Sequence, residues 1–290
     1  MRVHIAFCLS VALTSAACSG SPSNQQRTYT VQGQVLEVAP DHQQATVKHE
    51  EIRGFMSAMT MPYKVKDPQL LNGIAPGDLI NATLVVNANE AFFSEVKKVG
   101  EAPLEQAATE APSASSRFEL LKPGEPVPDT NFVDQNGRKK AFHAFNGSPL
   151  AITFMYTKCP LPDFCPLMDR NFAAVQQALT ADSALKKAHL VSISFDPVTD
   201  TPAVLKKHAS ELKADPTRWT FLTGDRDEID QFASRLGMAI ARSQTDPLNI
   251  THNLRTAIVD ADGKLVKVYT GNEWTPDQVI ADLKAVASAK

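Results

Sequence analysis

The sequence predicts a small all-β domain followed by a larger α/β domain. Residues 28–100 alternate apolar and polar positions with period two between turn residues, as short strands do. Residues 117–290 alternate apolar strand-like runs with helical patterns, which is typical of α/β domains. The chain has 290 residues, of which 43% are hydrophobic and 21% charged, and this length suits about two domains.

The chain begins with a targeting signal in this interpretation. Residues 3–17 form an apolar run behind Arg2 that is too short to span a membrane but fits a secretory signal. Small residues before Cys18 and a polar tether (18–27) resemble a bacterial lipoprotein signal. We therefore expect a signal peptide at 1–17, a lipid anchor at Cys18 and a mature protein on the periplasmic side, where disulfides persist. Simple cleavage nearby is the alternative.

In the first domain, strands are expected at 28–38, 45–49 and 78–86, the last after a Pro-Gly-Asp turn. Short strands separated by turns over this length favour a small barrel of the OB type.

A methionine cluster lies in the segment K-H-E-E-I-R-G-F-M-S-A-M-T-M-P-Y. It holds three of the seven methionines of the chain: Met56, Met59 and Met61. In an extended segment Met59 and Met61 point to one face, and His49, which closes the preceding strand, could meet them across a hairpin. Thioether and imidazole form a soft ligand set suited to Cu(I) or Ag(I). The alternative is that the methionines fill the barrel core.

Residues 101–116 are rich in Ala, Pro, Ser and Glu and read as a linker. A frayed helix is the alternative, which the prolines disfavour.

In the second domain, strands are expected at 149–156, 189–195 and 219–224, a hairpin at 256–269, and helices at 167–180, 201–212, 226–236 and 275–286. The order of strand, cysteines, helix, parallel strand, hairpin and helix is that of a thioredoxin-like domain.

The cysteines of this domain stand in T-K-C-P-L-P-D-F-C-P. Because Cys8 lies in the expected signal and Cys18 is the expected anchor, only Cys159 and Cys165 remain of the four. A structural disulfide over so short a loop would restrict the unfolded chain little, and a domain of this size does not need one. Reversible redox chemistry and metal binding are both favoured.

Two more features of this loop bear on its chemistry. Cys165 is expected just before a helix, with Pro166 at the first helical position, and a helix N-terminus favours a thiolate. Asp163 either orients the loop or a partner, or is a solvated charge.

The barrel segment resembles the periplasmic copper-binding CusF family, whose mark is a His followed by W-P-x-M-T-M. Here M-T-M is kept and Met56 takes the place of the tryptophan. The resemblance covers most of residues 28–100 and implies a copper site formed by His49, Met56, Met59 and Met61.

Residues 117–290 resemble the Sco/SenC family of copper proteins, whose marks are C-x-x-x-C-P, D-P-x-x-D-T-P and a distant histidine. This chain has Cys159 and Cys165, F-D-P-V-T-D-T-P at 195–202, and His252 eight residues before Asp260; its cysteine loop is two residues longer than usual. A lone histidine is more often structural, but its place in the motif makes His252 a candidate ligand. The resemblance implies Cu(I) or Cu(II) held by Cys159, Cys165 and His252.

These features predict an exported copper chaperone rather than an enzyme. The resemblance implies that its client is a cytochrome c oxidase subunit (the CuA centre) or another copper protein. One alternative is a thiol–disulfide oxidoreductase that uses Cys159 and Cys165 to reduce client cysteines, and another is copper buffering or resistance. A net charge of −3 offers no basic field for nucleic acid.

Overall fold

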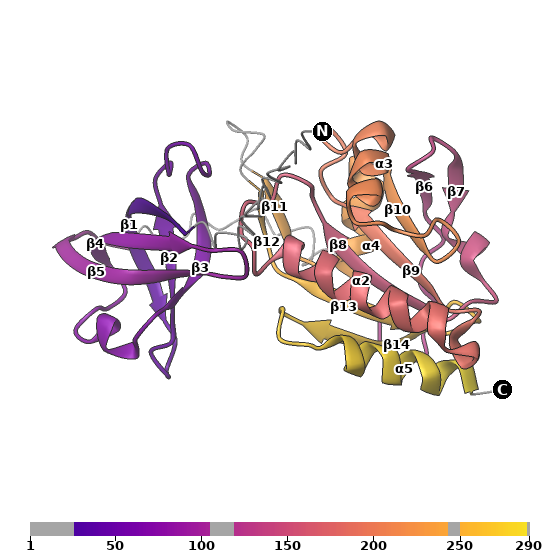
Figure 1. The fold of residues 1–290 in the computed structure, drawn as a ribbon. Coiled ribbons are helices and arrows are strands. Elements are labelled where there is room, and N and C mark those ends of the chain that lie inside the picture. Colours follow the sequence, from indigo (N-terminus) through magenta and orange to yellow (C-terminus); the bar gives the residue numbers. More distant parts are fainter. Residues whose placement is uncertain (1–25, 105–118, 243–249, 289–290) are drawn as a thin grey trace, which may run out of the picture.

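The computed structural model describes residues 26–104, 119–242 and 250–288, which form two domains side by side (Figure 1). The N-terminal domain is all β and the C-terminal domain is α/β, as the sequence predicts. The expected signal peptide at 1–17, the Cys18 anchor and most of the expected tether and linker lie outside the described residues.

Five strands of the N-terminal domain close into a barrel in the order β1-β2-β3-β5-β4. Their bounds are β1 (Arg27–Val38), β2 (Gln44–His49), β3 (Met59–Val65), β4 (Asp78–Val86) and β5 (Ala91–Glu101). A 3-10 helix, η1 (Pro68–Leu71), connects β3 to β4. β3 and β5 run parallel, and the other neighbouring strands pair antiparallel.

Closure of the barrel depends on Gly33, which pairs with His49 of β2 on one side and with Ile80 of β4 on the other. A Cβ atom at this position would lie 2.6 Å from the Lys48 carbonyl oxygen and 2.7 Å from a Val47 methyl group. Because only glycine lets β2 approach β1 this closely, Gly33 also fixes the position of His49 at the end of β2.

The C-terminal domain contains a seven-stranded sheet in the order β14-β13-β8-β9-β10-β6-β7. Its strands are β6 (Asn131–Asp134), β7 (Lys139–Ala141), β8 (Leu150–Met155), β9 (His189–Ser194), β10 (Trp219–Gly224), β13 (Arg255–Val259) and β14 (Leu265–Thr270). β8, β9 and β10 run parallel. All six residues of β8 are buried, as its continuous apolar sequence predicts.

Four α-helices cover this sheet: α2 (Cys165–Ala181), α3 (Pro202–Glu211), α4 (Arg226–Arg235) and α5 (Pro276–Ser288). α2 and α5 pack against each other, and α3 and α4 pack on β10 (Figure 1). None of the described helices combines the length and the apolar character needed to cross a membrane.

The four expected helices, the six expected strands and the expected hairpin at 256–269 are present, with boundaries that differ by at most two residues. The expected place of Cys165 is wrong by one position: it is the first residue of α2 rather than the residue before it. The sequence did not predict the β6–β7 hairpin, the 3-10 helices η2 (Phe142–Phe145) and η3 (Ser183–Leu185), or the separate sheet of β11 (Ile240–Arg242) and β12 (Ile250–His252).

Candidate metal centre

The two cysteines lie at the ends of the loop that connects the C-terminal end of β8 to α2. This end of the sheet faces the barrel (Figure 1). Cys159 is partly exposed and Cys165 is buried in the core beneath it, and both thiols are free. The loop follows a fully buried strand and precedes a long amphipathic helix, so both of its ends are held firmly by the core.

Asp200 anchors the start of this loop. Its carboxylate accepts hydrogen bonds from the Thr157 backbone N–H (3.0 Å), the Thr157 hydroxyl (2.5 Å) and the Ser194 hydroxyl (2.6 Å). Asp200 is fully buried. The second aspartate of the D-P-x-x-D-T-P motif therefore positions the backbone two residues before Cys159.

The two thiols are inequivalent. A hydrogen bond from the Cys165 thiol lowers the pKa of Cys159, although burial opposes the shift. The pKa of Cys165 is raised well above its ordinary value, because its thiol donates that hydrogen bond and is buried. The sequence favoured Cys165 as the thiolate because it stands at a helix N-terminus, whereas these shifts favour Cys159, which is also the more accessible sulfur.

His252 ends β12 and packs edge-on against Tyr156 and against Phe195, with ring centroids 5.7 Å and 4.6 Å away. Its Nδ1–H donates to the Asn253 carbonyl oxygen at 2.9 Å, which leaves the lone pair of Nε2 available. Burial lowers the pKa of His252 to about 4. The imidazole is therefore neutral at neutral pH, which is the form that binds metals.

The barrel arranges its candidate ligands on the β2–β3 hairpin. His49 pairs directly with Met59, and Val47 pairs with Met61, so His49, Met59 and Met61 lie on one face of the hairpin, as the sequence predicts for an extended segment. Met61 is buried and Met59 is partly exposed. The turn before β3 places Met56 in the core, where its sulfur lies 3.8 Å from the Tyr63 hydroxyl.

His49 has an unpaired buried nitrogen. Its Nδ1–H donates to the Glu50 carbonyl oxygen at 2.6 Å, and its Nε2 is buried without a hydrogen-bond partner. Burial lowers the pKa of His49, so the ring is neutral. A buried acceptor without a partner is costly in a packed core, and beside thioether sulfurs it fits a soft cation such as Cu(I).

The candidate ligands of the two domains face one another across the domain boundary. One cavity of about 30 Å³ is lined by Met56, Met59 and Met61 from the barrel and by Cys159 and His252 from the C-terminal domain. Two other candidate ligands, Cys165 and His49, do not line this cavity. In the described ranges, no group of three or more His, Cys, Asp or Glu side chains is arranged to hold a metal ion.

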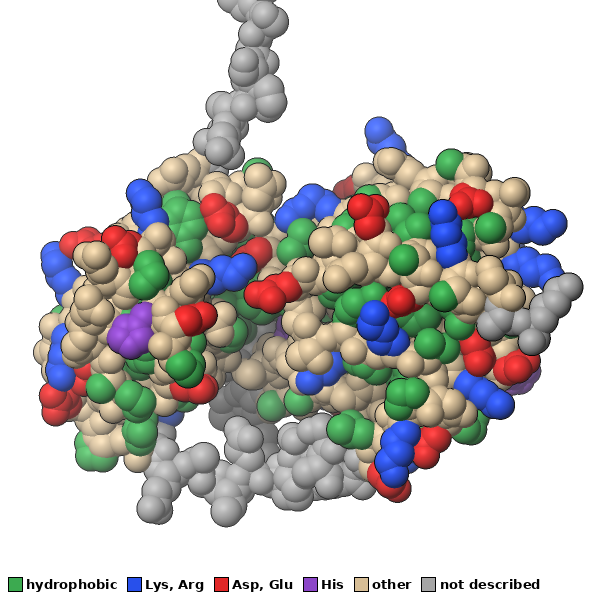
Figure 2. All heavy atoms as spheres, turned by 90° about the horizontal axis from the view of Figure 1, so that it is seen from below, with side chains coloured by type: hydrophobic (Ala, Val, Ile, Leu, Met, Phe, Trp, Pro, Cys, Tyr) green, Lys and Arg blue, Asp and Glu red, His purple; other side chains and the backbone are tan. Residues whose placement is uncertain are grey.

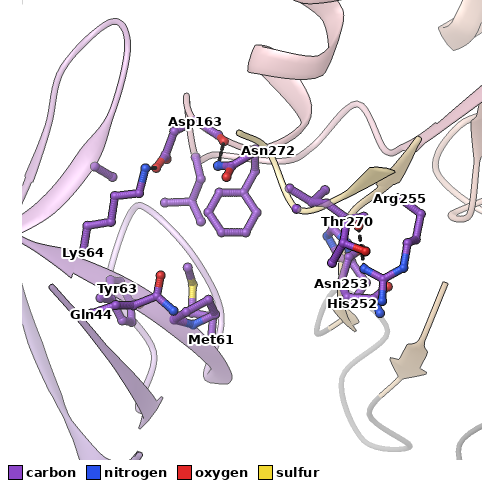
Figure 3. A pocket seen from close by; sticks show the side chains of 16 residues that line it. Gln44, Met61, Tyr63, Lys64, Asp163, His252, Asn253, Arg255, Thr270 and Asn272 are labelled. Carbon is purple, nitrogen blue, oxygen red and sulfur yellow. Dashed lines mark hydrogen bonds and ion pairs between the residues drawn. The ribbon is translucent and has the colours of Figure 1, made fainter. Parts of the chain in front are cut away.

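The cysteine loop makes much of the contact between the domains, and β12 also contacts β3. Leu161, only 5% exposed, belongs to the apolar cluster of the barrel, and Phe164 packs against that cluster. Asp163 is buried, lies 3.9 Å from the Lys64 ammonium, and accepts a hydrogen bond through its carbonyl from the Asn272 amide at 2.6 Å (Figure 3). Burial raises the pKa of Asp163, and the Lys64 charge opposes that shift.

The sequence left two interpretations of Asp163, a solvated charge or a residue that orients the loop. Because Asp163 is buried, the first interpretation is wrong. Asp163 orients the loop against the barrel. In the view of Figure 2, charged side chains of both signs lie along the seam between the two domains. The sequence carried a signal for Asp163, which is a charge between two cysteines, but none for the burial of Leu161 in another domain.

Comparison with protein families matches both domains. Residues 123–288 match the SCO1/SenC family, and residues 28–98 match the family described as copper binding periplasmic protein CusF. Both resemblances expected from the sequence are thus confirmed, and the family that matches the barrel is described as copper binding. A SCO1 protein homolog of Bacillus subtilis is 31% identical over 161 residues, which cover 55% of this chain and 81% of that relative.

Solved structures resemble the C-terminal domain. BsSco, described as a member of the Sco family of cytochrome c oxidase assembly proteins, has a TM-score of 0.50 and 28% identity, over 60% of this chain and 100% of that one. A SCO1/SenC family lipoprotein from Bacillus anthracis has a TM-score of 0.52 and 26% identity, over 58% of this chain and 99% of that one. These similarities confirm the thioredoxin-like fold of the Sco type for the C-terminal domain.

The anchoring role of Asp200 can be tested through stability. Asp200→Asn replaces one accepting oxygen with an amide nitrogen that only donates, so at least one of the three buried hydrogen bonds can no longer be accepted. We expect the free energy of unfolding to fall by about 1–3 kcal/mol in denaturant titrations. Asp262→Asn, in an exposed turn, is the matched control and should change it by less than about 0.5 kcal/mol. Equal effects of the two substitutions would contradict the role of Asp200.

Proposed function

Because the chain belongs to the SCO1/SenC family and carries a CusF-like barrel ahead of that domain, we propose that it is an exported copper chaperone. It binds copper in both domains and delivers it for assembly of the CuA centre of cytochrome c oxidase. The observation that carries the proposal is the cavity in which Cys159 and the neutral imidazole of His252 meet the methionines of the barrel. Thiolate and thioether sulfurs are soft ligands, and together with imidazole they select copper over hard cations.

In the C-terminal domain, Cys159, Cys165 and His252 are the proposed ligands. Two thiolates and one imidazole suit Cu(I) in a trigonal arrangement and Cu(II) in a tetragonal one. The lone pair of His252 Nε2 is available and the thiols are free. Each thiol that binds copper as a thiolate releases its proton, so the pair passes from a hydrogen-bonded dithiol to a metal-bound dithiolate.

In the barrel, which we propose to be of the OB type, His49, Met56, Met59 and Met61 are the proposed Cu(I) ligands. The unpaired Nε2 of His49 supports this assignment over core packing. Methionines that only fill a core need no imidazole beside them. These ligands are all neutral, so the barrel would hold Cu(I) without the proton release that accompanies binding to thiols.

A second candidate function is thiol–disulfide exchange on the client's cysteines. The feature that favours it is the lowered pKa of the partly exposed Cys159, to which the Cys165 thiol contributes most. An accessible thiolate with a resolving thiol beneath it is the arrangement that exchange requires. Copper buffering by the barrel is a third candidate. Thiol–disulfide exchange would not require His252 or the methionines. Copper buffering would not require a client protein.

We also propose that the protein acts on the periplasmic side of a membrane, to which Cys18 anchors it. The support comes from the sequence of its first eighteen residues and from relatives described as a periplasmic protein and as a lipoprotein. The proposed partner is a cytochrome c oxidase subunit, since BsSco is described as a member of a family of oxidase assembly proteins.

Anaerobic titration with Cu(I) tests the two sites. The intact chain should bind two ions, and the double variant Cys159→Ser, Cys165→Ser should bind one. The double variant Met59→Ala, Met61→Ala should also bind one, because one imidazole and the remaining thioether do not enclose Cu(I). Stoichiometry is read by mass spectrometry under native conditions. Two ions bound to either double variant would remove the corresponding site from the proposal.

The variant His252→Ala separates metal delivery from thiol exchange. It removes one of three ligands in the C-terminal domain but no part of the exchange chemistry. We expect Cu(II) absorption of that domain to be lost while Cys159 and Cys165 still oxidise and reduce. In cells that carry only this variant, assembly of CuA should fail. Oxidase activity that survives the loss of copper binding would favour exchange instead.

Fractionation of cells tests the anchor. Cys18→Ala should move the protein from the membrane fraction to the soluble periplasmic fraction, because it removes the thiol that receives the lipid. An unprocessed signal would be the better explanation if the variant stays with the membrane.

A further inference from the structure

The cavity at the domain boundary brings together ligands that belong to two different proposed sites. Met59 and Met61 reach it from β3, and Cys159 and His252 reach it from the C-terminal domain. Its volume of about 30 Å³ suffices for one ion and excludes any larger ligand. Two separate copper sites would require no such shared cavity between them.

The cysteine loop holds the two halves of the cavity together. Leu161 is buried in the apolar cluster of the barrel, and Cys159 packs partly against the same cluster. Lys64 of β3 pairs with Asp163, while Asn272 holds the backbone of Asp163 from the C-terminal side (Figure 3). The residues between the two cysteines therefore dock the barrel, and this docking places its methionines next to Cys159.

We propose that this cavity is a copper transfer site, in which one Cu(I) ion is bound at the same time by Met59 or Met61 of the barrel and by Cys159 of the C-terminal domain. The inference rests on the proposed function. It adds that copper passes between the two sites within one chain, without dissociating into solvent.

The transfer is an exchange of ligands. As the bond from Cu(I) to a methionine sulfur breaks, a bond to the Cys159 sulfur forms, and the thiol proton leaves to solvent. Copper remains Cu(I), so no electron moves and no oxidant or reductant is needed. The thioethers are neutral and the thiolates charged, so copper should move from the barrel to Cys159 and then to Cys165 and His252.

Alternative explanations of the cavity differ in what they require of the ligands. If the methionines only packed the core, their removal would affect stability but not copper affinity. If the two sites were independent, the first Cu(I) ion to bind would depend on the ligands of one domain only. A shared ion depends on both.

The test uses the full chain with Cys165→Ser, which blocks completion of the C-terminal site and should retain Cu(I) in the cavity. Affinity for the first Cu(I) equivalent is measured anaerobically by competition with a chromophoric Cu(I) chelator. Adding Cys159→Ser and, separately, Met59→Ala with Met61→Ala should each weaken binding at least tenfold. If only one of the two changes weakens binding, the sites are independent and the inference is overturned.

A docking variant provides a second arm, because it changes no proposed ligand. In the same Cys165→Ser background, Leu161→Asp should weaken the first Cu(I) equivalent at least tenfold by separating the domains. Leu120→Asp makes the same change at an exposed leucine and should leave the affinity unchanged. An unchanged affinity in Leu161→Asp would contradict a shared ion.

Selenium labelling gives a readout that does not depend on interface variants. In a selenomethionine-labelled chain with Cys165→Ser, and with Cys8 and Cys18 replaced by alanine, the sulfur of Cys159 is the only one left. X-ray absorption of the complex with one Cu(I) should show both sulfur and selenium bound to copper. Either neighbour alone would overturn the inference. If the inference is overturned but the wild-type chain still binds two Cu(I) ions, the proposed function stands. If the wild-type chain binds no Cu(I), the inference and the proposed function both fail.

Discussion

The insertion of Leu161 into the apolar core of the barrel is the contact on which the rest of the arrangement depends. Its burial is worth about 2 kcal/mol on general grounds, and the adjacent pair of Asp163 and Lys64 gives the contact its orientation. Because Leu161 lies between Cys159 and Cys165, the surface on which the barrel packs includes candidate functional residues. The barrel rests on the loop that carries the thiols, and the methionines of β3 are brought to those thiols as a result.

This arrangement gives a physical role to the length of the cysteine loop, which exceeds the usual Sco/SenC spacing by two residues. A shorter loop would leave less chain to reach the barrel while keeping Cys159 after β8 and Cys165 at the start of α2. Asp200 holds the start of the loop from within the core, so the loop can dock without displacing Cys159. The same segment thus serves as ligand carrier and as interface.

The sequence predicted much of the fold because long periodic segments report directly on local structure: the buried run of β8, the helix after Cys165, and the alternation that puts Met59 and Met61 on one face. The ligands expected from its motifs stay a prediction. The sequence did not predict the short strands β11 and β12, although β12 carries His252, since three residues hold no periodicity. The lowered pKa of Cys159 was missed because it depends on a hydrogen bond from the Cys165 thiol rather than on a helix terminus. The docking of Leu161 was missed because no local pattern encodes a contact between domains.

The contact between Leu161 and the barrel can be measured without copper, by methyl NMR on the reduced full chain. Leu161 and Met61 line the same cavity, so we expect nuclear Overhauser effects between the Leu161 methyl groups and the Met61 methyl group. Overhauser effects from Leu161 that are confined to the C-terminal domain would contradict the docking of the cysteine loop and, with it, the shared cavity.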